Sequence, residues 1–428
     1  MSAISRRGAA RLGLGIGLGA AAATTLAGCG SGEEQSRPPA GPGRNPDRPA
    51  APAKKAPPRL IGDGSTAYTG KQPHQPGAPA PLEVGQKPPQ FVIFSWDGAG
   101  EVGNGLFPRF LELAREHNAH MTFFLSGLYL LPESKKRLYR PPNNPVGASD
   151  IGYLTDSHVK ETLKHVHQAW LDGHEIGTHF NGHFCGGSGS VANWSAAQWR
   201  SEIQQAQAFV KSWRTNTGWH EHPSLPFDYD KELIGGRTPC LLGQDNLLPV
   251  ARELGWRYDA SSPGGLQRWP DKKQGVWDLP LQGIPFPGHR FEVLSMDYNI
   301  LANQSQNSTR APSSNYPGWR TQATQSYLAG FRRAYETNRA PFFIGNHFEE
   351  WNGGIYMDAV EAALKRIADK PDVRLVSFRQ FVDWLDAQDP AVLAKLRGLE
   401  VGERPPGGWS AFLRPEKRRT GAGGQPAK

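Results

Sequence analysis

Three histidines and one acid fall within eleven residues, GHEIGTHFNGH at positions 173–183. His179 and His183 are four residues apart, a spacing that can place two imidazoles on one metal ion or can mark a polar turn without chemistry. The zinc-protease pattern H-E-x-x-H does not apply, because His174-Glu175 is followed by His179 one residue too late. A metal at this segment would therefore need further ligands from other parts of the chain.

Ionisable residues that could supply these further metal ligands follow short apolar segments typical of buried strands. Asp97 closes FVIFSWDG, His347 closes PFFIGNH, and Arg237 and Asp259 follow later segments. Parallel strands of a barrel bring their C-terminal ends to one rim, so these distant side chains could converge.

Two imidazoles and a carboxylate form a three-ligand set that leaves a divalent cation open to water. Such an ion acidifies its water and polarises a carbonyl oxygen. A nearby carboxylate can then act as general base, and a separate histidine as general acid. The residue types therefore predict hydrolysis of an amide or an ester.

Amphipathic segments alternate with the apolar strands and would have to position these groups. Apolar residues recur at helical spacing in four segments, and three buried strands are expected beside them, with HEIGTH (174–179) as a further strand that runs into a loop. This alternation predicts a parallel α/β architecture. The expected helices are 107–117, 157–173, 196–213 and 357–369, and the expected strands are 91–98, 120–127 and 341–347.

The order of the motifs resembles the NodB-like polysaccharide deacetylases, in particular their chitin-deacetylase-like branch, over about residues 90–387. VIFSWDG is similar to the family's strand ending T-F-D-D, GHEIGTHFNGH to its metal motif H-S/T-x-x-H, GGRTPC to R-x-P-F/Y, and ELGWRYDASS to Y-D-S-S. GVWDLPL and NRAPFFIGNHFEEW also resemble family segments. The resemblance implies an incomplete (β/α) barrel of about seven parallel strands and metal-dependent removal of N- or O-acetyl groups from glycans.

The resemblance also implies roles for single residues. His179 and His183 would hold a divalent metal, Zn²⁺ foremost, with Co, Ni and Mn as alternatives. Arg237 would orient the catalytic carboxylate, and the backbone N–H of Cys240 would help to bind the oxyanion.

The remaining roles concern the leaving group and the sugar. His347 would be the general acid, with Asp259 steering its electrostatics. Trp351 is expected to line the cleft, because sugar faces stack on indole rings.

One departure from the family pattern concerns the metal. Asp97 matches the family's first Asp, the general base, and Gly98 matches the second, which is a metal ligand. Glycine has no side chain to coordinate. Either Asp97 serves the metal and another group such as water is the base, or the metal rests on two histidines with Asp97 at a distance. An alternative function is therefore a catalytically impaired glycan-binding surface lipoprotein, and a third is an O-acetyl esterase acting on polysaccharide.

The second departure is Cys240, which stands where the family has an aromatic residue. Cys185 follows His183 by two residues and Cys240 follows Arg237 by three, so both are expected near the rim. They would either form a disulfide that joins two motif loops or remain two free thiols. Export to an oxidising compartment is compatible with the disulfide.

The N-terminal residues predict export. Arg6, Arg7 and Arg11 precede an apolar run that is too short and too rich in glycine to span a membrane. The run ends in LAGC, which resembles a lipobox with Cys29 as the lipid attachment site; an ordinary secretory signal is the alternative. We expect a signal peptide over 1–28, a disordered Pro/Gly-rich tether over 29–88, the catalytic domain over 89–388 and a basic, mostly disordered tail over 389–428.

The chain has a formal charge of +8 and a pI near 9.3. Loss of the signal peptide removes three arginines and no acid, which leaves 45 − 40 = +5. Export argues against nucleic acid as a partner, whereas attraction to anionic lipid or wall polymer, or simply solubility, remains open. The sequence thus predicts a monomeric glycan hydrolase that is held on the outer face of the cell membrane by a lipid.

Overall fold

The computed structural model describes residues 58–414. The expected signal peptide, the lipid attachment residue Cys29 and the first half of the expected tether lie outside these residues. Within the described part, every helix is too short or too polar to cross a bilayer.

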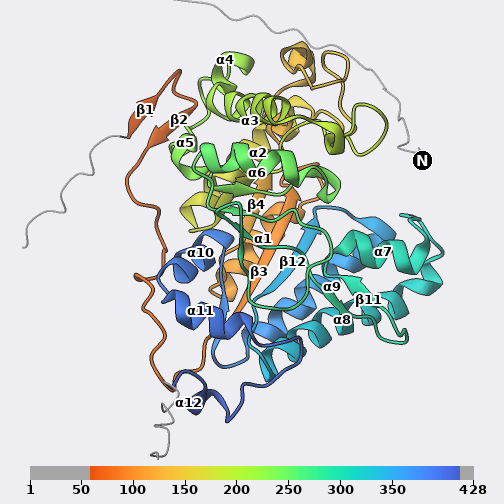
Figure 1. Ribbon diagram of the computed structural model, residues 1–428. Helices are drawn as coiled ribbons and strands as arrows, with labels where there is room; N and C mark the ends of the chain where they lie inside the picture. Colours follow the sequence, from red (N-terminus) through yellow and green to blue (C-terminus); the bar gives the residue numbers. More distant parts are fainter. Residues whose placement is uncertain (1–57, 415–428) are drawn as a thin grey trace, which may run out of the picture. The chain divides into compact units, whose positions relative to one another are not determined.

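A curled, mostly parallel sheet forms the centre of this unit (Figure 1). Seven strands run parallel in the order β12-β3-β4-β5-β6-β7-β9, β8 joins β9 antiparallel at the end, and β13 pairs with the start of β3. The two ends of this order are not paired, so the barrel is incomplete, as expected. The strands are β3 (Gln90–Gly98), β4 (Thr122–Leu125), β5 (Glu175–Thr178), β6 (Gly235–Gly236), β7 (Tyr258–Asp259), β8 (Lys272–Lys273), β9 (Val276–Asp278), β12 (Phe342–His347) and β13 (Val373–Leu375).

Helices connect successive strands, and side-chain caps fix where several of them begin. Ser195 and Gln198 form a capping box on α3, and Ser377 and Gln380 form another on α10. The expected helical segments are confirmed. The helices are α1 (Leu106–Glu116), α2 (Asp156–Leu171), α3 (Ala196–Lys211), α4 (Trp213–Thr217), α5 (Tyr229–Glu232), α6 (Gln244–Glu253), α7 (Asp297–Ser305), α8 (Tyr316–Glu336), α9 (Trp351–Ala368) and α10 (Phe378–Asp386).

Shorter elements complete the connections. The 3-10 turns are η1 (Gly127–Leu130), η2 (Glu133–Leu138), η3 (Val191–Asn193), η4 (Pro239–Leu241) and η5 (Ser313–Asn315), and β10 (Gly283–Pro285) pairs with β11 (Glu292–Leu294) in a separate hairpin. All nine residues of β3 are buried, because the strand has partners on both edges and helices on its outer face. This rigid central strand carries Asp97 to the rim.

The expectation of a disordered tether up to residue 88 is wrong for residues 58–88. They contain a hairpin of β1 (Arg59–Ile61) and β2 (Thr66–Tyr68). Ala67 N–H donates to the Leu225 carbonyl at 2.9 Å, and Leu82 N–H donates to Gln388 Oε1 at 2.8 Å. A segment with few apolar residues is thus held by polar contacts to distant parts of the chain, which composition does not reveal.

The expected C-terminal tail is also wrong over residues 389–414. Helix α11 (Pro390–Arg397) is capped by Asp389 and is followed by α12 (Trp409–Phe412). Leu393 and Leu396 are buried in the same apolar cluster as α10. Two leucines at helical spacing are enough to hold this basic segment on the domain.

Candidate functional site

The ionisable residues singled out in the sequence do meet at the C-terminal ends of the parallel strands. Asp97 on β3 and His347 on β12 are direct partners in the strand register. His179 follows β5 and Arg237 follows β6. The barrel thus brings four groups to one rim from positions as far apart as 97 and 347.

Asp97 and Arg237 form a buried ion pair. Arg237 Nη1 donates to Asp97 Oδ1 at 2.8 Å, and only 3% of the Asp97 side chain and none of that of Arg237 is exposed. Arg237 also donates to Ser95 Oγ at 2.9 Å and to the Ala260 carbonyl at 3.0 Å, which fixes the guanidinium. Burial alone would raise the pKa of Asp97, but the charge of Arg237 and its hydrogen bond bring that pKa below its usual value. Asp97 is therefore an oriented carboxylate that stays ionised at neutral pH.

His179 presents one free nitrogen. Its Nδ1 lies 2.8 Å from the Arg237 carbonyl oxygen, which can only accept, so Nδ1 carries the proton and Nε2 keeps its lone pair. Nε2 is buried and has no hydrogen-bond partner within residues 58–414. Burial lowers the pKa of His179 and holds the ring neutral. A neutral imidazole fixed through Nδ1, with a bare and buried Nε2, is the usual state of a metal ligand.

His183 lies beside it. The two ring centroids are 5.1 Å apart, and burial lowers the pKa of His183 to about 3, so this ring is neutral as well. The backbone of His183 is in the left-handed region at φ 58°. The N–H of Gly182, the residue before His183, donates to the Tyr139 hydroxyl at 3.0 Å. That hydroxyl in turn donates to Glu202 Oε1 on α3 at 2.9 Å. Helix α3 thereby positions the histidine loop.

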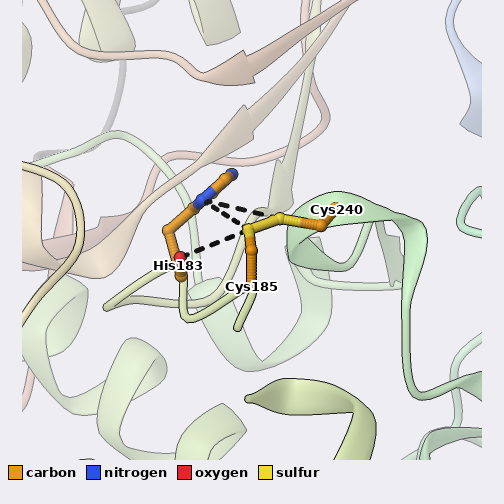
Figure 2. Close-up of side chains that lie close together, drawn as sticks. All are labelled: His183, Cys185 and Cys240. Atoms are coloured by element: carbon orange, nitrogen blue, oxygen red, sulfur yellow. Dashed lines mark hydrogen bonds between the residues drawn. A yellow bond between two sulfur atoms is a disulfide. The ribbon is translucent and has the colours of Figure 1, made fainter. Parts of the chain in front are cut away.

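A disulfide joins the two motif loops (Figure 2). Cys185 and Cys240 are 55 residues apart in sequence, and their Cα atoms are 5.8 Å apart. Cys185 Sγ lies 3.4 Å from His183 Nδ1, which leaves Nε2 as the nitrogen of His183 available to a ligand. Cys240 has φ 57°, and its N–H has no hydrogen-bond partner among the described residues, as an oxyanion donor requires.

Among the described residues, His179, His183 and Asp97 do not form the compact three-ligand set first expected. Within residues 58–414, the only three His, Cys, Asp or Glu ligand atoms lying within 4.8 Å of one another belong to His183, Cys185 and Cys240. Both of those sulfurs are in the disulfide and are not thiolates. Asp97 does not close a set with the imidazoles, because its carboxylate is drawn to Arg237. The second arrangement anticipated from Gly98, two histidines with Asp97 at a distance, stays a prediction.

His347 is held by a residue that the sequence did not single out. Its Nδ1 lies 2.8 Å from Asp297 Oδ1, and its backbone N–H donates to Asp297 Oδ2 at 2.7 Å. Burial by itself lowers the pKa of His347, but the negative charges of Asp297 and then Asp97 raise it to about 9. The ring is therefore an imidazolium at neutral pH.

Asp297 corrects the role expected for Asp259. Asp259 Oδ1 instead accepts from Ser261 Oγ at 2.6 Å, and burial raises the pKa of Asp259 to about 7. The segment LSMDYN offered only a lone acid among apolar residues as a signal. That signal is weak because the contact with His347 spans 50 positions.

Aromatic rings flank the imidazolium. Trp351 begins α9 with its ring centroid 5.4 Å from that of His347. The ring of Tyr298, which is 45% exposed, lies 5.9 Å from that of Trp351. These rings border the rim on the side of His347, where Trp351 was expected.

No family model and no curated protein matches the chain. Solved structures do. One from Mycobacterium smegmatis, described as a polysaccharide deacetylase, has 13% identity and a TM-score of 0.45 over 72% of this chain and 94% of its own. A family 4 carbohydrate esterase pseudoenzyme from Bacillus anthracis has 12% identity and a TM-score of 0.36, over 72% and 70%.

A peptidoglycan deacetylase from Bacillus subtilis, as a mutant, has 12% identity and a TM-score of 0.35, over 70% of this chain and 92% of its own. With TM-scores below 0.5, these likenesses carry no inference about activity, which has to be argued from the residues.

Proposed function

We propose that this protein is a metal-dependent hydrolase that removes acetyl groups from an N-acetylated glycan at the cell surface. One observation carries the proposal. Asp97 and His347 are register partners on adjacent strands, and each is locked by a buried residue of opposite charge, Arg237 and Asp297. A general base and a general acid are thus fixed side by side at one rim.

The protonation states suit these roles. The pKa of Asp97 is lowered and that of His347 is raised to about 9. At neutral pH the site therefore holds a carboxylate ready to accept a proton and an imidazolium ready to donate one. Two titratable groups whose surroundings drive their pKa values apart are the usual mark of an acid–base pair.

His179 and His183 would hold the cation, with Zn²⁺ foremost and Co, Ni and Mn as alternatives. When bound, the cation acidifies water and polarises the acetyl carbonyl. Two protein ligands should bind it less tightly than three, because position 98 contributes no carboxylate.

The chain's own groups complete the hydrolysis. Asp97 accepts a proton from the attacking water as the water oxygen bonds to the acetyl carbon. The free N–H of Cys240 donates to the oxygen that becomes negative. His347 gives its proton to the sugar nitrogen as the carbon–nitrogen bond breaks, and the products are acetate and a free amine. Trp351 offers an indole face for the sugar beside His347.

The cell-surface location rests on the N-terminal sequence. The LAGC segment supports lipid attachment at Cys29, and the Pro/Gly-rich residues after it suit a tether between membrane and domain. The proposed partners are thus a glycan, such as peptidoglycan, a chitin-like polymer or an exopolysaccharide, and a membrane reached through the lipid. Nucleic acid is not among them, and the protein would act as a monomer.

Metal content and acetate release test the proposal together. Purified protein should carry close to one equivalent of zinc or a similar ion and release acetate from acetylated chito-oligomers or peptidoglycan. His179→Ala should lose both properties. His220→Ala, which removes an exposed histidine outside the site motifs, should keep both.

The second candidate, a glycan-binding protein without activity, is favoured by the missing carboxylate at Gly98. It predicts retained glycan binding with no acetate release at any metal concentration, and that result would refute the hydrolase. The O-acetyl esterase uses the same groups and differs only in substrate. A panel of N- and O-acetylated glycans separates it from the N-deacetylase.

A further inference from the structure

A tyrosine fills the space beside Asp97 that the neighbouring glycines leave open. Gly98 ends β3 at φ 86°, and a Cβ built on it would lie 3.2 Å from Cε2 of Tyr129. A Cβ on Gly100 would lie 2.4 Å from Cδ2 of the same ring. Tyr129 belongs to η1, directly after β4, so the ring packs on the backbone that leaves Asp97. The absence of a side chain at these two positions therefore leaves the room that the Tyr129 ring occupies.

The Tyr129 hydroxyl stands close to where a side chain at position 98 would begin. It lies 3.7 Å from the Cβ position built on Gly98, within the space that a short acidic side chain would enter. Among residues 58–414 this hydroxyl makes no hydrogen bond, and the side chain is only partly buried. A tyrosine hydroxyl in this setting is an uncommitted donor.

A carboxylate also acts on the Tyr129 hydroxyl. Glu349, two residues after His347, acts electrostatically on both Tyr129 and His347. Burial, and then the charge of Glu349, raises the pKa of Tyr129 well above its usual value. Tyr129 therefore stays protonated and can donate a hydrogen bond, but it does not supply a phenolate to a cation.

We propose that Tyr129 is a further catalytic residue whose hydroxyl takes the place of an acidic side chain at position 98 and donates a hydrogen bond to the acetyl oxygen of the substrate. This inference rests on the proposed deacetylase function. Two donors, Tyr129 and the Cys240 N–H, would then face the oxygen that becomes negative. Compared with a carboxylate at position 98, the neutral hydroxyl of Tyr129 would bind the metal less well but would stabilise the oxyanion.

Removal of the hydroxyl alone is the first test. Tyr129→Phe keeps the ring on Gly98 and Gly100, so the melting temperature should not change. We expect kcat to fall about 100-fold with KM within a few-fold, the usual effect of losing one oxyanion donor. Binding of acetate, followed by isothermal titration calorimetry, should weaken by about tenfold. Tyr335→Phe, which removes a hydroxyl bonded to the Pro371 carbonyl, is the matched control.

The inference is overturned if Tyr129→Phe keeps kcat and acetate affinity within twofold of the wild type. The outcome can be separated from failure of the proposed function. A wild type that releases no acetate refutes the function, whereas an active wild type with a fully active Tyr129→Phe refutes only the role of Tyr129.

A double-mutant cycle tests the placement without relying on activity. Gly98→Asp alone should not raise zinc affinity, since the new Cβ meets the Tyr129 ring. Gly98→Asp combined with Tyr129→Ala should raise it by at least about tenfold, because a carboxylate can then join His179 and His183. Asp is among the residues that best tolerate the left-handed backbone of position 98.

Zinc affinity in this cycle is measured by competition with a chromogenic chelator. The placement is wrong if Gly98→Asp gains as much affinity alone as in the pair, or if the folded double variant gains none. If the pair does not fold, the Tyr129→Phe measurements still decide the inference.

Discussion

Replacement of Asp297 by Asn should move the basic limb of the pH–rate profile to lower pH. Asp297 is fully buried and accepts from His347 at two atoms, Nδ1 at 2.8 Å and the backbone N at 2.7 Å. Asn has the same shape, and its single oxygen can still accept from one of these two donors, which keeps the ring close to its place. The substitution removes the negative charge and leaves the packing nearly unchanged.

The magnitude follows from the pKa of His347. Burial lowers that pKa, and Asp297, Asp97 and Glu349 raise it to a net value of about 9, against an ordinary 6.5. Without the charge of Asp297, the pKa should fall to its ordinary value or below. The protonated fraction at pH 8 would drop from about 90% to about 3%, a rate loss of about 30-fold. At pH 5.5 both proteins stay mostly protonated, so their rates should agree within about twofold.

Initial rates of acetate release between pH 5 and pH 10 locate the basic limb of the pH–rate profile. An NMR titration of the His347 ring measures the pKa of His347 without turnover. Asp259→Asn is the matched control: its carboxylate bonds Ser261 and not His347, so the limb should stay near pH 9. If Asp297→Asn leaves the limb and the titration where the wild type has them, Asp297 does not keep His347 protonated. If Asp259→Asn moves them instead, the role first expected for Asp259 would be reinstated.

Three further predictions concern stability. Cys185→Ser combined with Cys240→Ser opens a loop of 55 residues and should lower the free energy of unfolding by up to about 4 kcal/mol, seen as a lower urea midpoint that reductant no longer changes. Burial raises the pKa of Glu202 to about 7 from an ordinary 4.5, so the folded state holds the proton more tightly. Glu202 should lower the stability by at most about 3 kcal/mol as pH rises from 4.5 to 7. Glu202→Gln should make the slope in thermal melts shallower, while Asp259, whose pKa burial also raises, keeps its own part; a parallel slope in the variant would contradict the prediction. Leu396→Ala should cost about 2–5 kcal/mol and lower the melting temperature, whereas an unchanged midpoint would mean that α11 adds nothing to the fold.

The strands, the main helices and most of the rim residues followed from local patterns. FVIFSWDG and PFFIGNH carry no ionisable residue before Asp97 and His347, because a buried strand excludes charge until it leaves the sheet. That single feature located Asp97 and His347, and the parallel topology then made them neighbours. The capping boxes at Ser195 and Ser377 are equally local, since a side chain there satisfies the first free N–H groups of its own helix.

The groups that tune these residues did not follow from the sequence. Asp297 and Asp259 are both single acids in mixed segments, and only the course of the chain after β11 brings Asp297 to His347. Tyr129 looked like one more aromatic residue of an apolar stretch. The order of residues 58–88 was missed for the same reason, because it depends on contacts with distant partners such as Gln388. The order of residues 389–414 was missed because it depends on the burial of Leu393 and Leu396 beside α10.

By itself, the sequence determined which residues could do chemistry and which strands would carry them, because burial and backbone pairing impose a periodic pattern on neighbouring residues. Only the tertiary structure decided that Asp97 stands apart from the two imidazoles, that Asp297 charges His347, and that Tyr129 occupies the space over Gly98. Those outcomes depend on distances of a few ångströms between segments that are remote in the chain. No pattern of neighbouring residues encodes such distances.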